Sequence, residues 1–183
     1  MAIDTEDHTV LSNIALAIAR AASEYGCDGT ALLADAGIDP DDAQEPDSRI
    51  SVVAHQRLWR LAIDRTDNPC LAIKVGEALP PGAIHGLGLG WLASDTLKSA
   101  LERLVRFQRL VSTNADIQLT ETNDCYELIG QPRRTPKTFE PASADALMVL
   151  TLRLCRLALS ESVAPDKVEL AHNPSTCLGV YQT

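Results

Sequence analysis

One stretch of the sequence decides the fold: residues 94–131 read SDTLKSALERLVRFQRLVSTNADIQLTETNDCYELIGQ. Its first half places leucines and valine at helical spacing from Leu97 to Val111, and Ser94 or Asp95 can cap that helix. Its second half predicts two strands, 116–122 and 125–131, joined by a tight turn. A long helix followed by a hairpin favours an α+β protein over one with alternating parallel strands.

Helical patterns continue on both sides of this stretch. A second long helix of leucines follows the hairpin, and a short strand is expected near the end of the chain. The expected helices are 11–25, a short one ending at Gly37, 52–65 capped by Ser51, a short one between Asn68-Pro69 and Pro80, and 144–160; the last expected strand is 168–172. We therefore expect a mostly helical α+β fold with a β-hairpin and at least one further strand forming a small sheet. Residues 1–183 are expected to make a single domain.

The composition narrows the class of protein. The 183 residues carry a net charge of −9, and charged residues make up 22% of the chain, which is ordinary for a globular protein. The acidic balance opposes nucleic-acid binding by this chain alone. No stretch approaches the roughly 18–20 continuous apolar residues of a membrane span, and no secretory signal is visible.

The cysteines and histidines predict neither a metal site nor a cofactor. Five cysteines without a CxxC pair argue against a disulfide framework or a structural zinc site, and they favour a reducing cytoplasm. The four histidines lie in four different expected elements, without metal-ligand spacing. A GxGxG segment at 86–90 differs from the dinucleotide fingerprint, and it favours close packing of small residues. No GxSxG elbow or activated nucleophile is present, so we do not expect an enzyme.

The long expected helix carries arginines that can be interpreted in two ways. Arg103, Arg106 and Arg109 recur every three residues, which is typical of a solvated helix face. The alternative is a wall that faces an anion, because guanidinium groups bind carboxylates through two hydrogen bonds. The scarce aromatic residues, including Trp91 and Tyr126, belong either to the core or to a ligand platform.

Three stretches together resemble a known family. They read SRISVVAHQRLWRLAIDRTDNPCLAIKVGE at 48–77, HGLGLGWLASDTLKSALERLVRFQRL at 85–110 and VELAHNPSTCLGVY at 168–181. Their order and spacing resemble the N-terminal regulatory domain of AraC/XylS-type transcription regulators, in the mostly helical branch commonly labelled arabinose-binding. The resemblance covers the chain from about residue 11 onward.

The resemblance is partial at several family motifs. Ser51 stands where the family has proline after Arg-Ile, and Ala72 stands where the family has glycine after Asp-Pro-x-Leu. The resemblance implies a C-terminal pair of helix-turn-helix motifs, which we expect this chain to lack, together with the last strands of the family domain.

The resemblance implies a function and a set of partners. We expect a ligand-sensing and dimerisation domain that binds a small metabolite and controls an attached DNA-binding domain. The expected partners are a small-molecule effector and a second copy in a homodimer, with DNA reached only through the absent C-terminal domain and no membrane contact. The alternative is a ligand-free dimerisation module that uses the helix at 144–160.

A pocket is expected between the segment 86–92, the long helix and the hairpin. The candidate ligand-binding residues are polar or aromatic groups that flank the best-matched stretch. They are His85, Trp91, Arg103, Arg106, Tyr126 and His172.

Overall fold

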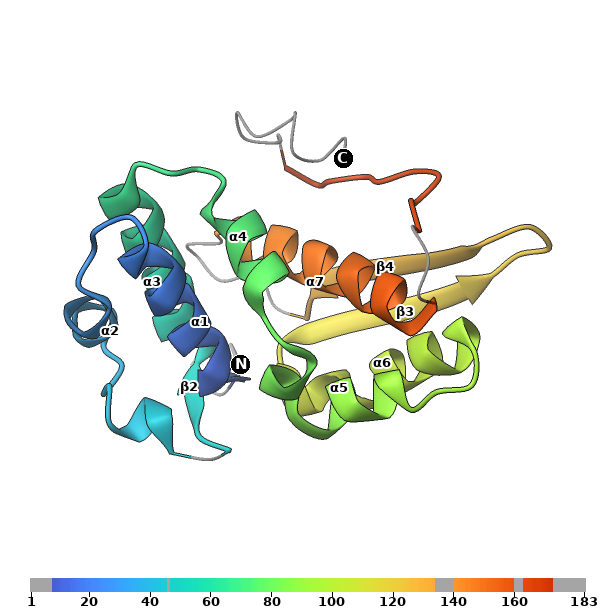
Figure 1. The fold of residues 1–183 in the computed structure, drawn as a ribbon, viewed down its shortest axis with the longest axis horizontal. Helices are drawn as coiled ribbons and strands as arrows, with labels where there is room; N and C mark the ends of the chain where they lie inside the picture. Colours follow the sequence, from blue (N-terminus) through green and yellow to red (C-terminus); the bar gives the residue numbers. More distant parts are fainter. Residues whose placement is uncertain (1–7, 46, 134–139, 160–162, 173–183) are drawn as a thin grey trace, which may run out of the picture.

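A computed structural model describes residues 8–45, 47–133, 140–159 and 163–172 of the chain. The fold is mostly helical α+β, as the sequence predicted, with two small antiparallel sheets of two strands each (Figure 1). The bounds of its N-terminal elements are β1 Thr9–Leu11, α1 Ser12–Ser23, α2 Gly29–Ala36, the 3-10 helix η2 Asp42–Gln44, β2 Arg49–Ser51, α3 Val52–Thr66 and α4 Leu71–Ala78. The remaining elements are the 3-10 helix η3 Pro81–Ile84, α5 His85–Leu92, α6 Leu97–Val111, β3 Ala115–Glu121, β4 Tyr126–Pro132 and α7 Ala142–Leu159.

Side chains at the helix starts explain several of these bounds. The hydroxyl of Ser51 accepts a hydrogen bond from the backbone N–H of Ala54, so the predicted cap of α3 is confirmed. The cap of α6 is neither of the predicted residues, Ser94 and Asp95. It is Thr96, because Thr96 and Ser99 form a reciprocal capping box. The segment 85–92 is the helix α5, and Gly88 lets it pack closely on the backbone of Pro81.

The predicted hairpin is confirmed in β3 and β4. The register runs from Ala115 opposite Pro132 to Glu121 opposite Tyr126. Helix α6 covers one side of the hairpin, and Ile117 is buried beneath it. The side chain of Gln108 fixes this contact, because its amide bonds both the N–H and the carbonyl of Ile117 at 2.6 and 3.1 Å.

Helix α7 joins the hairpin end of the molecule to the N-terminal helices. It packs against α4, where a Cβ on Gly76 would lie 2.7 Å from the Cβ of Val149. Leu150 and Leu154 of α7 are buried in the same core as Ile18, Leu58 and other residues of the N-terminal helices. One hydrophobic core therefore runs from β1 to α7.

Two expectations from the sequence are wrong. Residues 168–172 form no strand; the pair β1 and β2, which lies far from them in the sequence, supplies the further strands. The apolar alternation at 168–172 is local, and a strand also needs a neighbour to satisfy its backbone groups. Cys70 is disulfide-bonded, although the cysteine pattern argued against disulfides, whereas Cys27, Cys125 and Cys155 are free thiols.

Within the described ranges, no helix combines the length and apolarity that crossing a membrane would require.

Candidate functional site

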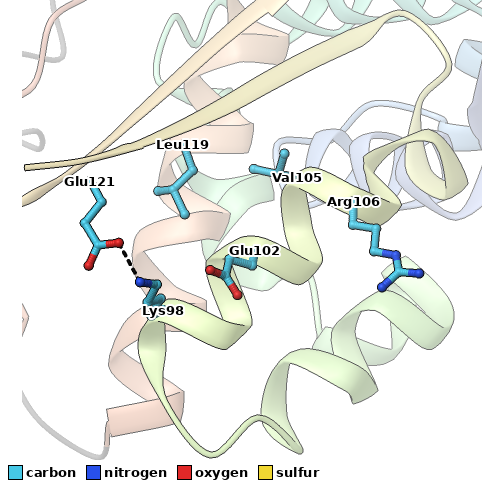
Figure 2. A pocket seen from close by; sticks show the side chains of 6 residues that line it. All are labelled: Lys98, Glu102, Val105, Arg106, Leu119 and Glu121. Carbon is cyan, nitrogen blue, oxygen red and sulfur yellow. Dashed lines mark hydrogen bonds and ion pairs between the residues drawn. The ribbon is translucent and has the colours of Figure 1, made fainter.

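A groove of about 280 Å³ lies between α6 and β3. Three successive turns of α6 form one wall, and β3 contributes the other. The lining residues are Lys98, Glu102, Val105, Arg106, Leu119 and Glu121 (Figure 2). The groove arises because the apolar stripe of α6 packs on the hairpin through its buried side, which leaves the charged side of the helix beside the sheet edge.

One end of the groove is closed by a small polar network. Nζ of Lys98 lies 2.5 Å from Oε2 of Glu121, and the hydroxyl of Tyr126 donates to Oε1 of the same carboxylate at 3.3 Å. The hydrogen bond from Lys98 lowers the pKa of Glu121, and the same bond raises the pKa of Lys98. Both groups therefore stay charged, and they neutralise each other at this end.

The middle and the far end of the groove carry charged side chains that form no close ion pair like that of Lys98 and Glu121 within the described part of the chain. Glu102 lies one turn after Lys98, and Arg106 lies one turn after Glu102. The guanidinium of Arg106 extends away from the Lys98–Glu121 pair (Figure 2). It lies 5.2 Å from the ring centre of Phe107. Val105 and Leu119 provide an apolar floor between the two walls. The groove thus offers an anion, a cation and an apolar surface within two helical turns.

Two of the six predicted site residues border this groove. Arg106 lines it, and Tyr126 holds the carboxylate at its closed end. Arg103 lies on the adjacent face of α6, where its side chain comes close to Gly90 of α5.

The other three predicted residues lie elsewhere. The ring of His85 is held on both sides, because Nδ1 lies 2.6 Å from Oδ1 of Asp47 and the amide of Asn13 donates to Nε2 at 2.8 Å. Trp91 is fully buried, and its indole N–H donates to the carbonyl of Leu154 at 2.9 Å. Nε2 of His172 lies 3.0 Å from Oδ1 of the buried Asp145 in the first turn of α7. The structure therefore does not gather the six residues into one cluster, and their contacts with a ligand stay predictions.

Glu102, Lys98 and Glu121 line the groove but were not among the residues predicted from the sequence. Lys98 and Glu121 form an ion pair between α6 and β3, although they are 23 positions apart in the sequence. No local sequence pattern could therefore have predicted this pair. Glu102 carried one usable signal, since it precedes Arg106 by four residues and shares its face of the helix.

Nowhere in the described part of the chain do three or more histidine, cysteine, aspartate or glutamate side chains converge as metal ligands would.

The chain was compared with known proteins. Residues 26–183 match the family model of the arabinose-binding domain of AraC transcription regulator, N-terminal. No curated protein matches the chain significantly.

Proposed function

Because the chain belongs to the family of N-terminal arabinose-binding domains of AraC transcription regulators, we propose that it senses a small metabolite and forms a homodimer. The metabolite would bias the activity of an attached helix-turn-helix DNA-binding domain in the cytoplasm of a bacterium. Residues 1–183 would act in this as a single effector-binding domain. Such control requires that the ligand bind one of two states more tightly, with a coupling of about 1–3 kcal/mol being typical.

The observation that carries the proposal is the groove between α6 and β3. Its two walls belong to different elements, so a bound ligand would alter how α6 sits on the hairpin. Arg106 in the wall is free of ion pairs among the described residues, and it can bind an anionic group of the ligand. Tyr126 would contribute through the carboxylate of Glu121 that it holds.

Thermal unfolding in a panel of sugars, amino acids and organic acids tests the sensing role. A ligand at a hundred times its Kd stabilises the folded state by about 2.7 kcal/mol. For a domain of this size, that raises the melting temperature by several degrees. We expect one chemical class to produce the shift and Arg106→Ala and Tyr126→Phe to reduce it. If the shift survives both substitutions, the ligand binds outside this groove. If no compound produces a shift, the sensing role is contradicted.

The ligand-free dimerisation module remains the second candidate, and the structure offers it apolar surface on α7 and also on α5 and α6. The stripe of α7 that the sequence suggested points into the core through Leu150 and Leu154. The end of α7 does expose Leu157 and Leu159, at 46% and 38%, and α5 and α6 expose apolar side chains as well, with Leu89 at 64% and Leu110 at 51%. Light scattering at rising concentration tests this candidate. The dimerisation module would be favoured over sensing if the chain forms a dimer that Leu89→Asp dissociates and if no compound of the panel changes this dimer.

A further inference from the structure

The groove holds one close ion pair at one end and two less closely matched charges beyond it, of which Glu102 still helps to raise the pKa of Lys98. Lys98 and Glu121 form a close ion pair, whereas neither Glu102 nor Arg106 has an ion-pair partner among the described residues. The acidic and the basic group lie in the same groove and are one helical turn apart. This end of the groove therefore presents one negative and one positive charge to whatever occupies it.

The separation of these two charges runs against the local tendency of a helix. A glutamate four residues before an arginine favours a direct ion pair on an exposed helix face. Here the guanidinium of Arg106 instead lies over the Phe107 ring. Figure 2 shows that it points away from Glu102. Residues at this spacing have Cβ atoms about 5–6 Å apart. The two charged groups lie further apart than the Cβ atoms because the side chains point in different directions (Figure 2). A small ligand that carries both an ammonium and a carboxylate can offer each of them its counter-charge.

We propose that the groove binds a zwitterionic amino acid with an aliphatic side chain. Its ammonium group binds Glu102, its carboxylate binds Arg106, and its side chain lies on Val105 and Leu119. This inference rests on the proposed sensing function and names the ligand class of the same groove.

Other ligand classes satisfy the groove less well. A simple carboxylate would pair with Arg106 and place its negative charge near Glu102, and a simple amine would do the reverse. A neutral sugar would leave both charges without a counter-charge, and no aromatic ring lines the groove to stack on it. The volume, about 280 Å³, is just below the roughly 300–1,000 Å³ of typical ligand pockets, which suits a single amino acid.

Calorimetric titration with three molecules of similar shape tests the proposal on the whole chain. The probes are leucine, isopentylamine, which lacks the carboxylate, and 4-methylpentanoate, which lacks the ammonium. Ion pairs in an exposed groove are individually weak, so the titration should extend to millimolar ligand. We expect leucine to bind about three- to fivefold more tightly than either analogue.

Variants assign the two ends of the ligand. Arg106→Gln and Glu102→Gln should each weaken leucine binding about three- to fivefold. Arg109→Gln is the matched control, because Arg109 is also exposed on α6 but does not line the groove, and it should leave the affinity unchanged. Both changed side chains in the groove are exposed, so circular dichroism of the variants should match that of the parent chain.

The outcomes separate this inference from the function on which it rests. The proposal that the groove binds a zwitterion is wrong if leucine and one analogue bind with equal affinity. It is also wrong if the affinity for leucine is unchanged in both groove variants. If only a sugar or an organic acid stabilises the chain, the zwitterion proposal is wrong, whereas the proposed sensing function is supported. If no compound of any class binds, the inference and the sensing function fail together.

Discussion

His55 shows how strongly one buried side chain can depend on its surroundings. It is 6% exposed on α3, and Nε2 of its ring accepts a hydrogen bond from the indole N–H of Trp59 at 3.1 Å. Burial lowers the pKa of His55 from 6.5 to about 4. Protonation would place an unpaired charge in the core and would remove the acceptor that Trp59 uses.

This pKa shift predicts a loss of stability in mild acid. The unfolded chain takes up the proton below about pH 6.5, whereas the folded chain resists it until about pH 4. The contribution of neutral His55 is therefore complete above pH 6.5 and falls by about 2 kcal/mol at pH 5. Urea unfolding of the parent and of His55→Gln at pH 7 and pH 5 measures it. The variant keeps an acceptor for Trp59 and should lose less stability; an equal loss would contradict the prediction.

Two glycines of α5 differ in what a methyl group would meet. A Cβ on Gly88 would lie 1.9 Å from the carbonyl oxygen of Pro81, whereas a Cβ on Gly86 meets nothing within 4 Å. We expect Gly88→Ala to cost at least about 3 kcal/mol, since the backbone itself must move. Gly86→Ala should be neutral or stabilising by up to about 1 kcal/mol. Thermal unfolding of both variants checks this. Similar melting temperatures would contradict the prediction, because they would show that the backbone of η3 moves aside at little cost.

At the scale of elements, Arg49 fastens the end of α6 to the N-terminal strands. Its guanidinium donates to the hydroxyl and carbonyl of Thr9 at 2.7 and 3.3 Å, and to the carbonyls of Leu110 and Val111 at 2.7 and 3.5 Å. The two last carbonyls belong to the C-terminal turn of α6, where cations are favourable. If a ligand in the groove moves α6, as we propose, Arg49 connects that movement to β1 and β2.

Replacing Arg49 tests how much this connection stabilises the fold. Arg49→Lys keeps the charge but cannot reach both elements from one planar fork. We expect a loss of about 1–2 kcal/mol, below the range for buried charged hydrogen bonds because Arg49 is exposed. Arg57→Lys, on the exposed face of α3, is the control and should change nothing. Equal unfolding midpoints in urea for the two variants would mean that the four bonds contribute no net stability.

The elements also show how far local sequence signals reach. Helix α3 and the hairpin could be predicted nearly to the residue, because apolar spacing, the Ser51 cap and the turn at 122–125 are all local. The strand expected at 168–172 failed because pairing depends on a distant partner. The same limit applies to the candidate site. Arg106 could be predicted from the spacing of arginines on its helix, whereas Glu121 joins the site only because β3 lies beside α6 in the fold. Trp91 was open to both interpretations, and its burial against α7 is a tertiary property.

At the scale of the molecule, the core predicts that the two ends unfold together. The same cluster of buried side chains includes Trp59 of α3, beside the N-terminal helices, and Trp91 of α5, against α7. A domain with one continuous core unfolds in a single cooperative transition, whereas two domains can unfold separately. The two tryptophans are the chain's full set, so each can be observed alone after the other is replaced.

Trp59→Phe and Trp91→Phe make this prediction measurable. Each substitution lowers stability to its own extent, so the comparison is made within one variant, between tryptophan fluorescence and circular dichroism during urea unfolding. In each variant we expect both signals to change at the same urea concentration. A ligand that binds the groove should then move both signals of a variant equally, because it stabilises the whole folded unit. If Trp59 reported a transition that the ligand leaves in place while the Trp91 signal shifts, the groove and the N-terminal helices would belong to separate units, and a signal from the groove could not cross between them through the core.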